Sequence, residues 1–320
     1  MKEAHFRLSA ELLSMIAAQQ KRRKDNLIVR ARIIQSIRNF FIDNDYTEIE
    51  TPIRIPAPAL EAHIDAVESG DWFLQTSPEL CMKMLLATGF RRIFQICKCF
   101  RQGERGRLHL PEMTMLEWYR INSDYLDVMK ECETLISQVA RHINPKNTVI
   151  YQETEIDLTP PWRRISVAEA FKSFSSMSME AALESDRFDE IMVEAIEPNL
   201  GQPRPVFLYD YPLARSALAR RKPGGGRYAE RFELYIGGLE ICNAFSELTD
   251  PVEQRQRFES ERNRRKASGR LISPMPEKFL AALGNMSEAA GNALGIDRLV
   301  MLFTDSNKID EVVAFTPEEL

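Results

Sequence analysis

Several common features are missing from this sequence. It contains no apolar run of about 18 residues or more, which is what a membrane-spanning helix requires. Its net charge of −5 lacks the basic bias of a dedicated nucleic-acid-binding protein. Neither a P-loop lysine motif nor GxGxxG occurs, which argues against a P-loop or Rossmann nucleotide site. The N-terminus has no small-residue cleavage site after an apolar core, so we expect no signal peptide and a cytoplasmic protein.

Cysteine is scarce and scattered. The 5 cysteines are an odd number in an intracellular-looking chain, so we expect reduced thiols and no disulfide framework. Cys97 and Cys99 form a CxC pattern inside a predicted strand. No second Cys/His pair follows at ligand spacing, and core packing is therefore favoured over a metal site.

What the chain does contain is enough apolar sequence, 44% of 320 residues, to bury a sizeable core. Helical spacing of apolar residues predicts helices over residues 9–42 and 124–142. The pattern then weakens into short amphipathic helices at 167–174, 179–183 and 188–196. We interpret residues 1–320 as a single domain in which 122–205 is a more variable, helical insertion.

The most informative stretch is FRQGERGRLHLPEMTMLEWY, residues 100–119. Two strand-like runs flank a polar loop, which predicts a hairpin with a charged tip. Arg101, Arg105, Arg107 and His109 in that loop suit a polyphosphate, because guanidinium groups bind phosphate oxygens in pairs. The alternative is a surface hairpin whose charges are solvated.

Period-two alternation in the second strand of this hairpin predicts that Met113, Met115, Glu117 and Tyr119 share one face. Thr114, Leu116 and Trp118 would share the other. The first face therefore carries a carboxylate and a phenol close to the charged loop.

Three further stretches have local signals. In Thr76-Ser77-Pro78-Glu79 the order of residues predicts a helix start, with Ser77 as its cap. A second hairpin is predicted from strands at 231–236 and 239–248, joined by two glycines. Gly291 to Gly295 form a glycine-containing strand, after which Asp297 can cap a helix with Arg298 in its first turn. An arginine at such a junction can meet an anion.

Together these stretches resemble the catalytic domain of class II aminoacyl-tRNA synthetases, and most closely the lysine enzymes. TEIETPI (47–53) is similar to motif 1, residues 100–119 to motif 2, and GNALGIDRLVML (291–302) to motif 3. TSPELCMK (76–83) and ERFELYIGGLEICNAFSELTDP (230–251) are lysyl-like as well. The resemblance implies an α+β fold with an antiparallel sheet flanked by helices, and a homodimer formed through motif 1.

The resemblance also implies ATP bound in a bent shape with Mg²⁺. Arg101 would bind the α-phosphate, while Arg298 and His109 would hold the β/γ end. Glu233 and Glu240 match the family's metal-binding acids, and oxygen ligands suit Mg²⁺. Catalysis would act by positioning and electrostatics, without a protein nucleophile.

A lysine pocket is implied by matching positions, and a buried ammonium does need acids and hydrogen-bond acceptors around it. The matching residues are Ser77, Glu79, Glu117, Tyr119, Asn243, Phe245, Glu247 and Ala293. Strand alternation places Asn243 and Glu247 on one face and Glu240 on the other. The metal role of Glu240 therefore requires a bulge or twist in this strand.

Some positions depart from the synthetase pattern. Gly103 stands where the family has a glutamate that reads the adenine amino group, so either Glu104 substitutes or the contact is lost. Met113 replaces the phenylalanine that stacks on adenine, and a thioether still packs against a ring. Ala293 replaces a glycine of lysyl-tRNA synthetases and should reshape the amino-acid pocket by one methyl group.

A last departure is an expected absence. Only about thirty residues precede the first core helix, and no strand pattern for an anticodon-binding barrel occurs at either end. A truncated lysyl-type domain with alanine in motif 3 resembles the elongation factor P lysyl-lysine ligase family. That resemblance implies lysine, preferentially (R)-β-lysine, as substrate and elongation factor P as acceptor, with tRNA not expected as the main substrate.

Two alternatives stay open at this stage. One is a stand-alone aminoacylase that charges tRNA or another acceptor. The other is a catalytically inactive regulator that keeps the fold and binds a nucleotide or a partner. The retained Arg101, His109, Glu233, Glu240 and Arg298 argue against the regulator.

Overall fold

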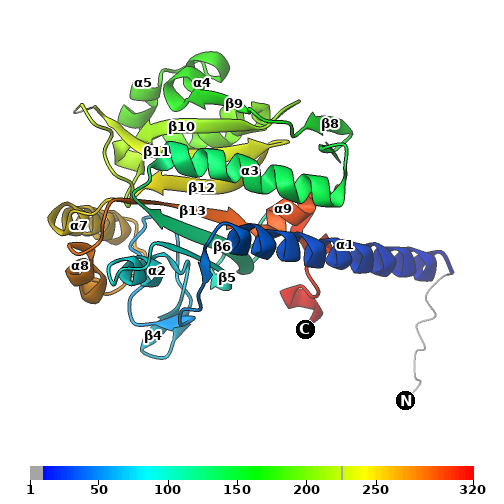
Figure 1. Cartoon of the computed structure of the whole chain (residues 1–320), viewed down its shortest axis with the longest axis horizontal. Coiled ribbons are helices and arrows are strands. Elements are labelled where there is room, and N and C mark those ends of the chain that lie inside the picture. Colours follow the sequence, from blue (N-terminus) through cyan, green and yellow to red (C-terminus); the bar gives the residue numbers. More distant parts are fainter. Residues whose placement is uncertain (1–9, 225) are drawn as a thin grey trace.

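The computed structural model describes residues 10–224 and 226–320, and within them a central eight-stranded sheet organises the chain (Figure 1). Its strand order is β1 (Thr47–Glu48), β5 (Arg92–Phe100), β6 (Glu112–Ile121), β13 (Ala289–Gly295), β12 (Leu239–Ser246), β11 (Tyr228–Ile236), β10 (Val206–Pro212), β9 (Arg163–Ser166). Neighbours from β5 to β10 pair antiparallel, while β1 and β9 are parallel edge strands. Both predicted hairpins and the antiparallel α+β architecture are confirmed.

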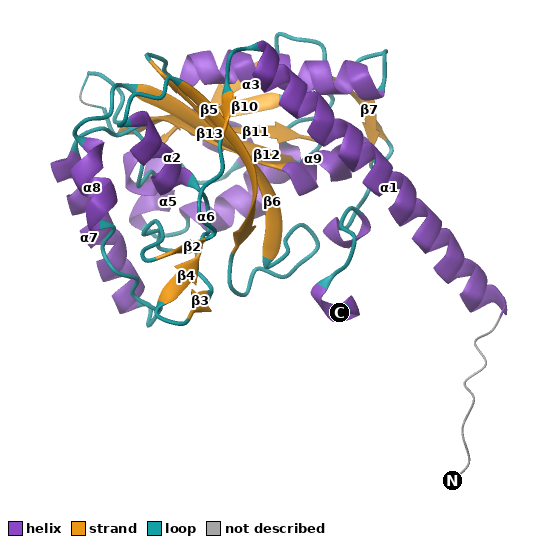
Figure 2. Ribbon diagram, turned by 60° about the horizontal axis from the view of Figure 1, so that its bottom comes forward, coloured by secondary structure: helices purple, strands orange, loops and turns teal. Residues whose placement is uncertain are grey.

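One face of the sheet is covered by α1 (Ala10–Asp43), α3 (Tyr125–Ile143) and α9 (Ile296–Phe303). The aromatic centre of this layer is Phe41, whose ring stacks on Phe94 at 4.7 Å between centroids and lies 5.3 Å from Trp118. Figure 2 shows α1 crossing the sheet on this side and projecting beyond it. The helix predicted from residue 9 begins at Ala10 in the described part of the chain, and Ser9 lies outside it.

The opposite face carries a second apolar cluster built from α2 (Glu79–Leu86), α7 (Pro251–Ala267) and α8 (Glu277–Leu283). These helices pack near Ile93 and Tyr119 at one end of the sheet. A cavity opens on the same face of the sheet, and Tyr119 lines it. Among residues 10–224 and 226–320, no helix combines the length and the apolarity needed to cross a membrane.

Residues 122–205 follow the expectation only in part. The three short helices occur as α4 (Val167–Phe174), α5 (Met179–Glu184) and α6 (Phe188–Ile191), the last continued by a π-helical turn. They form their own core against β10 and β11. However, α3 belongs to the main core and β9 to the main sheet. The short strand β9 has two arginines and little periodicity, so it carries no signal in the sequence.

Smaller elements complete the chain. A three-stranded sheet contains β2 (Arg54–Ile55), β4 (Trp72–Leu74) and β3 (Glu68–Ser69), and a hairpin contains β7 (Thr148–Tyr151) and β8 (Thr154–Asp157). Short helical turns occur at Met192–Ile196, Glu197–Asn199, Leu213–Arg215, Ile309–Glu311 and Pro317–Glu319. The segment between β2 and β3 passes over the open face of the main sheet.

Candidate active site

A cavity of about 500 Å³ opens on the sheet face opposite α1 and α3. Its floor comes from β6, β11, β12 and β13, as the alternation in β6 predicted. Of the residues predicted to form the site, those lining the cavity are Ser77, Glu79, Arg101, Glu104, His109, Met113, Glu117, Tyr119, Glu233, Glu240, Asn243, Phe245, Ala293 and Arg298. Gly103 and Glu247 do not line it. The binding roles assigned to these residues remain predictions.

A β-bulge in β12 brings Glu240 into the cavity. Leu234 pairs with Cys242 and Tyr235 pairs with Glu240, so Ile241 is an extra residue without a partner on β11. One extra residue reverses the alternation of side chains between the two flanking segments. Glu240 therefore faces the same cavity as Asn243, and the bulge that its predicted metal role requires is present.

At one end of the cavity, Arg298 connects motif 3 to the motif 2 loop. It donates to the Glu240 carboxylate at 2.9 Å and to the Glu240 carbonyl at 2.9 Å. Its Nη2 also contacts Nε2 of His109 at 2.5 Å. Burial and the neighbouring Arg298 charge lower the pKa of His109. A neutral imidazole can accept the guanidinium hydrogen, so these two residues form one donor-rich wall.

Arg101, Arg105, Arg107 and His109 were all expected to bind a polyphosphate, but only Arg101 and His109 line the cavity. Arg105 pairs with Glu318 at 2.8 Å and Asp310 at 3.0 Å, and Arg107 donates to the Asn307 carbonyl at 3.1 Å. Both point to the C-terminal segment and neither lines the cavity. Two carboxylates bind Arg105 and a backbone carbonyl binds Arg107, and these partners are so far away in sequence that a local pattern cannot reveal them.

Arg101 does face the cavity. Among the described residues its buried Nε has no hydrogen-bond partner, and the nearest carboxylate, Glu104, lies 3.8 Å from Nη1. A buried guanidinium donor without a partner is unfavourable, and an anion bound in the cavity would satisfy it. Gly103 lies at a turn with φ of +77°, outside the cavity lining.

The other end of the cavity is acidic. Glu117 accepts a hydrogen bond from the Ser77 hydroxyl at 2.6 Å and one from the Tyr119 hydroxyl at 2.7 Å. Burial, and then the charge of Glu79, raise the pKa of Glu117 to about 7. A cation bound beside Glu117 would favour its ionised form and return the pKa to lower values.

Next to the acidic end lies an ion-pair cluster that was not predicted from the sequence. Lys83 is fully buried between Glu79 and Glu247 and pairs with both carboxylates. Burial lowers the pKa of Lys83, but the two carboxylates outweigh it and the net shift is upward. Burial raises the pKa of Glu247 to about 8 against the charge of Lys83. Glu247 does not line the cavity, and it is linked to the acidic end through its ion pair with Lys83. The i, i+4 spacing from Glu79 to Lys83 was the sequence signal from which part of this cluster could have been predicted.

Comparison with known proteins agrees with this geometry. The model of class II tRNA synthetases of the D, K and N type matches residues 4–319. The chain belongs to this family.

It is 38% identical over 308 residues to the elongation factor P–(R)-β-lysine ligase of Edwardsiella ictaluri, covering 91% of this chain and 94% of that protein. The ligase of the same name from Erwinia tasmaniensis is 38% identical over 309 residues, with the same coverage. The lysine–tRNA ligase of Clostridium perfringens is 35% identical over 324 residues, covering 91% of this chain and 64% of that enzyme.

Two predicted helix caps in this class II synthetase domain are wrong. α2 begins at Glu79 with Pro78 at the cap position; Ser77 still accepts from the Glu79 amide at 3.0 Å, but its hydroxyl hydrogen goes to Glu117. Asp297 lies inside the first turn of α9 and accepts from Arg30 at 2.6 Å and from the Thr114 amide at 2.7 Å. Ser77 and Asp297 form hydrogen bonds with residues of other helices and strands, and local capping rules do not describe such contacts.

Glu233 and Glu240 form the predicted metal pair of the domain. Glu233 accepts from Tyr211 at 2.5 Å, Tyr235 at 2.7 Å and Arg231 at 2.6 Å. Among the described residues no group of three or more His, Cys, Asp or Glu side chains forms a complete metal site. Two carboxylates fit Mg²⁺, because this ion is commonly held by one or two carboxylates together with substrate phosphates.

Proposed function

We propose that this domain activates lysine or (R)-β-lysine as the aminoacyl-adenylate and transfers it to the ε-amino group of a lysine on elongation factor P. The observation that carries the proposal is one cavity that is lined by Arg101, His109 and Arg298 at one end and by acids at the other, with the buried Nε of Arg101 lacking a hydrogen-bond partner among the described residues. ATP would occupy the end formed by Arg101, His109 and Arg298, and the amino-acid side chain the end formed by Glu117 and Tyr119. The names of two relatives whose alignments cover 91% of this chain, at 38% identity, support the same reaction.

In the first step the amino-acid carboxylate attacks the α-phosphorus of ATP. A carboxylate–phosphorus bond forms, the bond to the bridging oxygen breaks, and pyrophosphate leaves with the electron pair. Arg101 stabilises charge on the α-phosphate, while Arg298 and His109 orient the leaving group. Mg²⁺, held by Glu233 and Glu240, would supply neutralising charge at the phosphates.

In the second step the neutral ε-amine of the acceptor lysine attacks the acyl carbon of the adenylate. An amide bond forms, AMP leaves, and the amine gives up its proton to solvent. The chain supplies no nucleophile for this step, so its contribution is to hold the adenylate and exclude water.

The acidic end gives this reaction its amino-acid selectivity. Glu117, with Ser77 and Tyr119 donating to it, would exchange part of this hydrogen bonding for the terminal ammonium of the substrate. Glu79 and Glu247, paired with Lys83, add negative charge nearby. Ala293, the residue paired with Glu117 on β13, adds a methyl group at this end.

The decisive experiment incubates the protein with ATP, Mg²⁺, a lysine isomer and elongation factor P. Its mass should increase by one lysyl unit, as measured by intact-protein mass spectrometry. An unchanged mass with lysine and with both β-lysine enantiomers would reject the proposal. Labelled lysine that becomes acid-precipitable on tRNA would instead support a stand-alone aminoacylase, which the lysine–tRNA ligase relatives make the second candidate.

The dependence of lysine binding on pH provides a further prediction. Burial raises the pKa of Glu117 to about 7, so this carboxyl is largely protonated below that pH in the empty site. The substrate ammonium stays charged up to about pH 10. KM for lysine should therefore fall as pH rises from 6 to 8, by up to about tenfold per unit on the acid side. In Glu117→Gln the slope should be reduced; a KM that rises over this range would contradict the assignment.

We also propose that the domain is a homodimer formed through motif 1. This segment provides β1, an edge strand of the main sheet, and Ile42 and Ile53, which precede and follow it in the chain, are 58% and 43% exposed. Exposed apolar residues around an unpaired edge are suited to a partner. Sedimentation velocity should give twice the 36.8 kDa chain mass, and Ile53→Glu should reduce it to that of one chain.

A further inference from the structure

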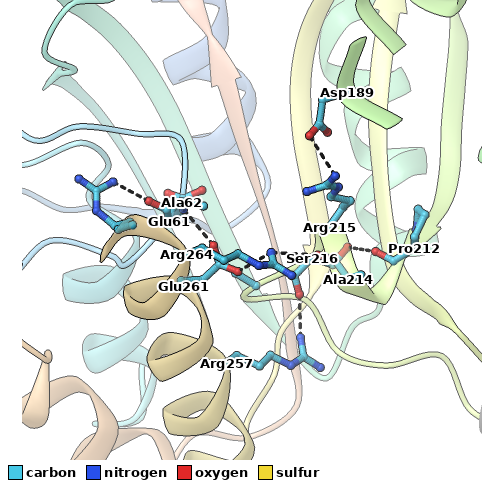
Figure 3. A network of polar contacts seen from close by, with 12 residues as sticks. Glu61, Ala62, Asp189, Pro212, Ala214, Arg215, Ser216, Arg257, Glu261 and Arg264 are labelled. Atoms are coloured by element: carbon cyan, nitrogen blue, oxygen red, sulfur yellow. Dashed lines mark hydrogen bonds and ion pairs between the residues drawn. The ribbon is translucent and has the colours of Figure 1, made fainter. Parts of the chain in front are cut away.

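The loop between β2 and β3 brings into the cavity an acid, Glu61, that belongs to none of the motif-like stretches. Glu61 lines the cavity together with Ala62, His63 and Ile64. Side chains of α7 hold the peptide group that joins Glu61 to Ala62: the Glu61 carbonyl accepts from Arg265 at 2.8 Å, and the Ala62 amide donates to Glu261 at 2.9 Å. These contacts fix the loop against a helix (Figure 3).

The same helix also holds the opposite rim. Arg257 donates to the carbonyls of Ser216 at 2.7 Å and Ala219 at 2.6 Å, and Arg264 donates to that of Ala214 at 3.4 Å (Figure 3). The segment 214–219 lines the cavity as well. The same helix therefore anchors both rims of the cavity, including the segment that carries Glu61.

The charges around Glu61 place it between the two ends of the cavity. Burial raises the pKa of its carboxyl to about 7, and the charge of Glu79 adds to this, while Arg101 and Arg231 act in the opposite direction. Glu79 belongs to the acidic end and Arg101 to the phosphate end. Among the described residues, the hydrogen bonds that involve Glu61 are made by its backbone.

The number of ammonium groups in the substrate can be compared with the number of acids, including Glu61, that could bind them. Lysine and β-lysine each carry two ammonium groups. Lys83 forms ion pairs with Glu79 and Glu247, whereas among the described residues neither Glu117 nor Glu61, which both line the cavity, has an ion-pair partner. Only one of these two can take the terminal ammonium.

We propose that Glu61 binds the second ammonium of the substrate, the one next to its carboxylate, while Glu117 binds the terminal one. The carboxylate must reach the α-phosphate at Arg101, which brings the neighbouring ammonium to the region between Arg101 and Glu79 where Glu61 lies. Glu61 thereby contributes to the binding of both lysine and (R)-β-lysine. The inference rests on the proposed function, since it assigns an ammonium of the same substrate.

The test compares wild type, Glu61→Gln and Glu61→Asp in ATP–pyrophosphate exchange with lysine and (R)-β-lysine. Two competitive inhibitors separate the ammonium groups: 6-aminohexanoic acid keeps the terminal one, and norleucine keeps the one beside the carboxylate. In Glu61→Gln, KM for both diamino acids and Ki for norleucine should rise about tenfold or more. Ki for 6-aminohexanoic acid and kcat should change less than about twofold, and Glu61→Asp should be intermediate. Glu259→Gln, the same change of charge at an exposed position of α7, should match wild type.

Equal increases for both inhibitors would show a displaced loop and overturn the assignment, as would unchanged KM and Ki values in Glu61→Gln. A wild-type protein that exchanges with neither lysine isomer would instead reject the proposed function itself. The two failures are therefore distinguishable in one set of measurements.

Discussion

Arg101→Ala is expected to reduce amino-acid-dependent ATP–pyrophosphate exchange by at least about a hundredfold. The guanidinium lines the cavity with a buried Nε that has no partner among the described residues, so its hydrogen bonds are available for the reacting phosphate. Removing it should leave the free energy of unfolding within about 0.5 kcal/mol of wild type, because no ion pair of the core is lost. Exchange kinetics and chemical denaturation measure the two quantities.

The matched control for this substitution is Arg105→Ala in the same loop. Arg105 pairs with Glu318 and Asp310 outside the cavity, so its loss should leave exchange within about threefold of wild type. Arg298→Ala should also abolish exchange, but it leaves Glu240 without its cation and is the less clean test. Equal losses in the Arg101 and Arg105 variants would show that the loop acts through its conformation.

Gly291→Ala is expected to raise KM for lysine by at least about tenfold. A β-carbon at this position would lie 2.3 Å from Cε1 of Tyr119 and 2.8 Å from Oε1 of Glu247. The tyrosine ring must move away, which breaks its hydrogen bond to Glu117 and displaces the acidic end of the cavity. We expect a loss of about 1–3 kcal/mol in stability from the overpacking. KM for ATP should change much less.

Gly284→Ala serves as the control for Gly291→Ala. An added β-carbon there would meet only Cγ of Pro251, at an ordinary 3.8 Å. Its exchange kinetics should equal those of wild type. If Gly291→Ala raised KM for ATP as much as KM for lysine, the close packing of Tyr119 would not belong to the amino-acid pocket.

Local periodicity explains why much of the fold and of the cavity floor could be predicted. Alternation along β6 places Glu117 and Tyr119 opposite Leu116 and Trp118, and the structure buries the latter pair in the core. Alternation is a property of the strand itself and needs no knowledge of its neighbours. The three short helices after α3 were likewise predictable from their spacing, whereas the strand β9 was not.

Side-chain partners could not be predicted in this way. Arg101 and Arg105 lie in one loop with the same chemistry, yet one faces the cavity and the other binds the C-terminal segment. The bulge at Ile241, which turns Glu240 inward, depends on the pairing of two strands. Such choices are made by residues distant in sequence, through burial and charge.

The family, the antiparallel hairpins and the residues that face the cavity along a regular strand could be read from the amino-acid order alone, because they follow from motifs and from the period of a strand. The position of Lys83 between Glu79 and Glu247, and the entry of Glu61 into the cavity, depend on the folded chain. A long charged side chain can reach many partners within its radius. Which one it meets is set by the packing of elements that are far apart along the chain.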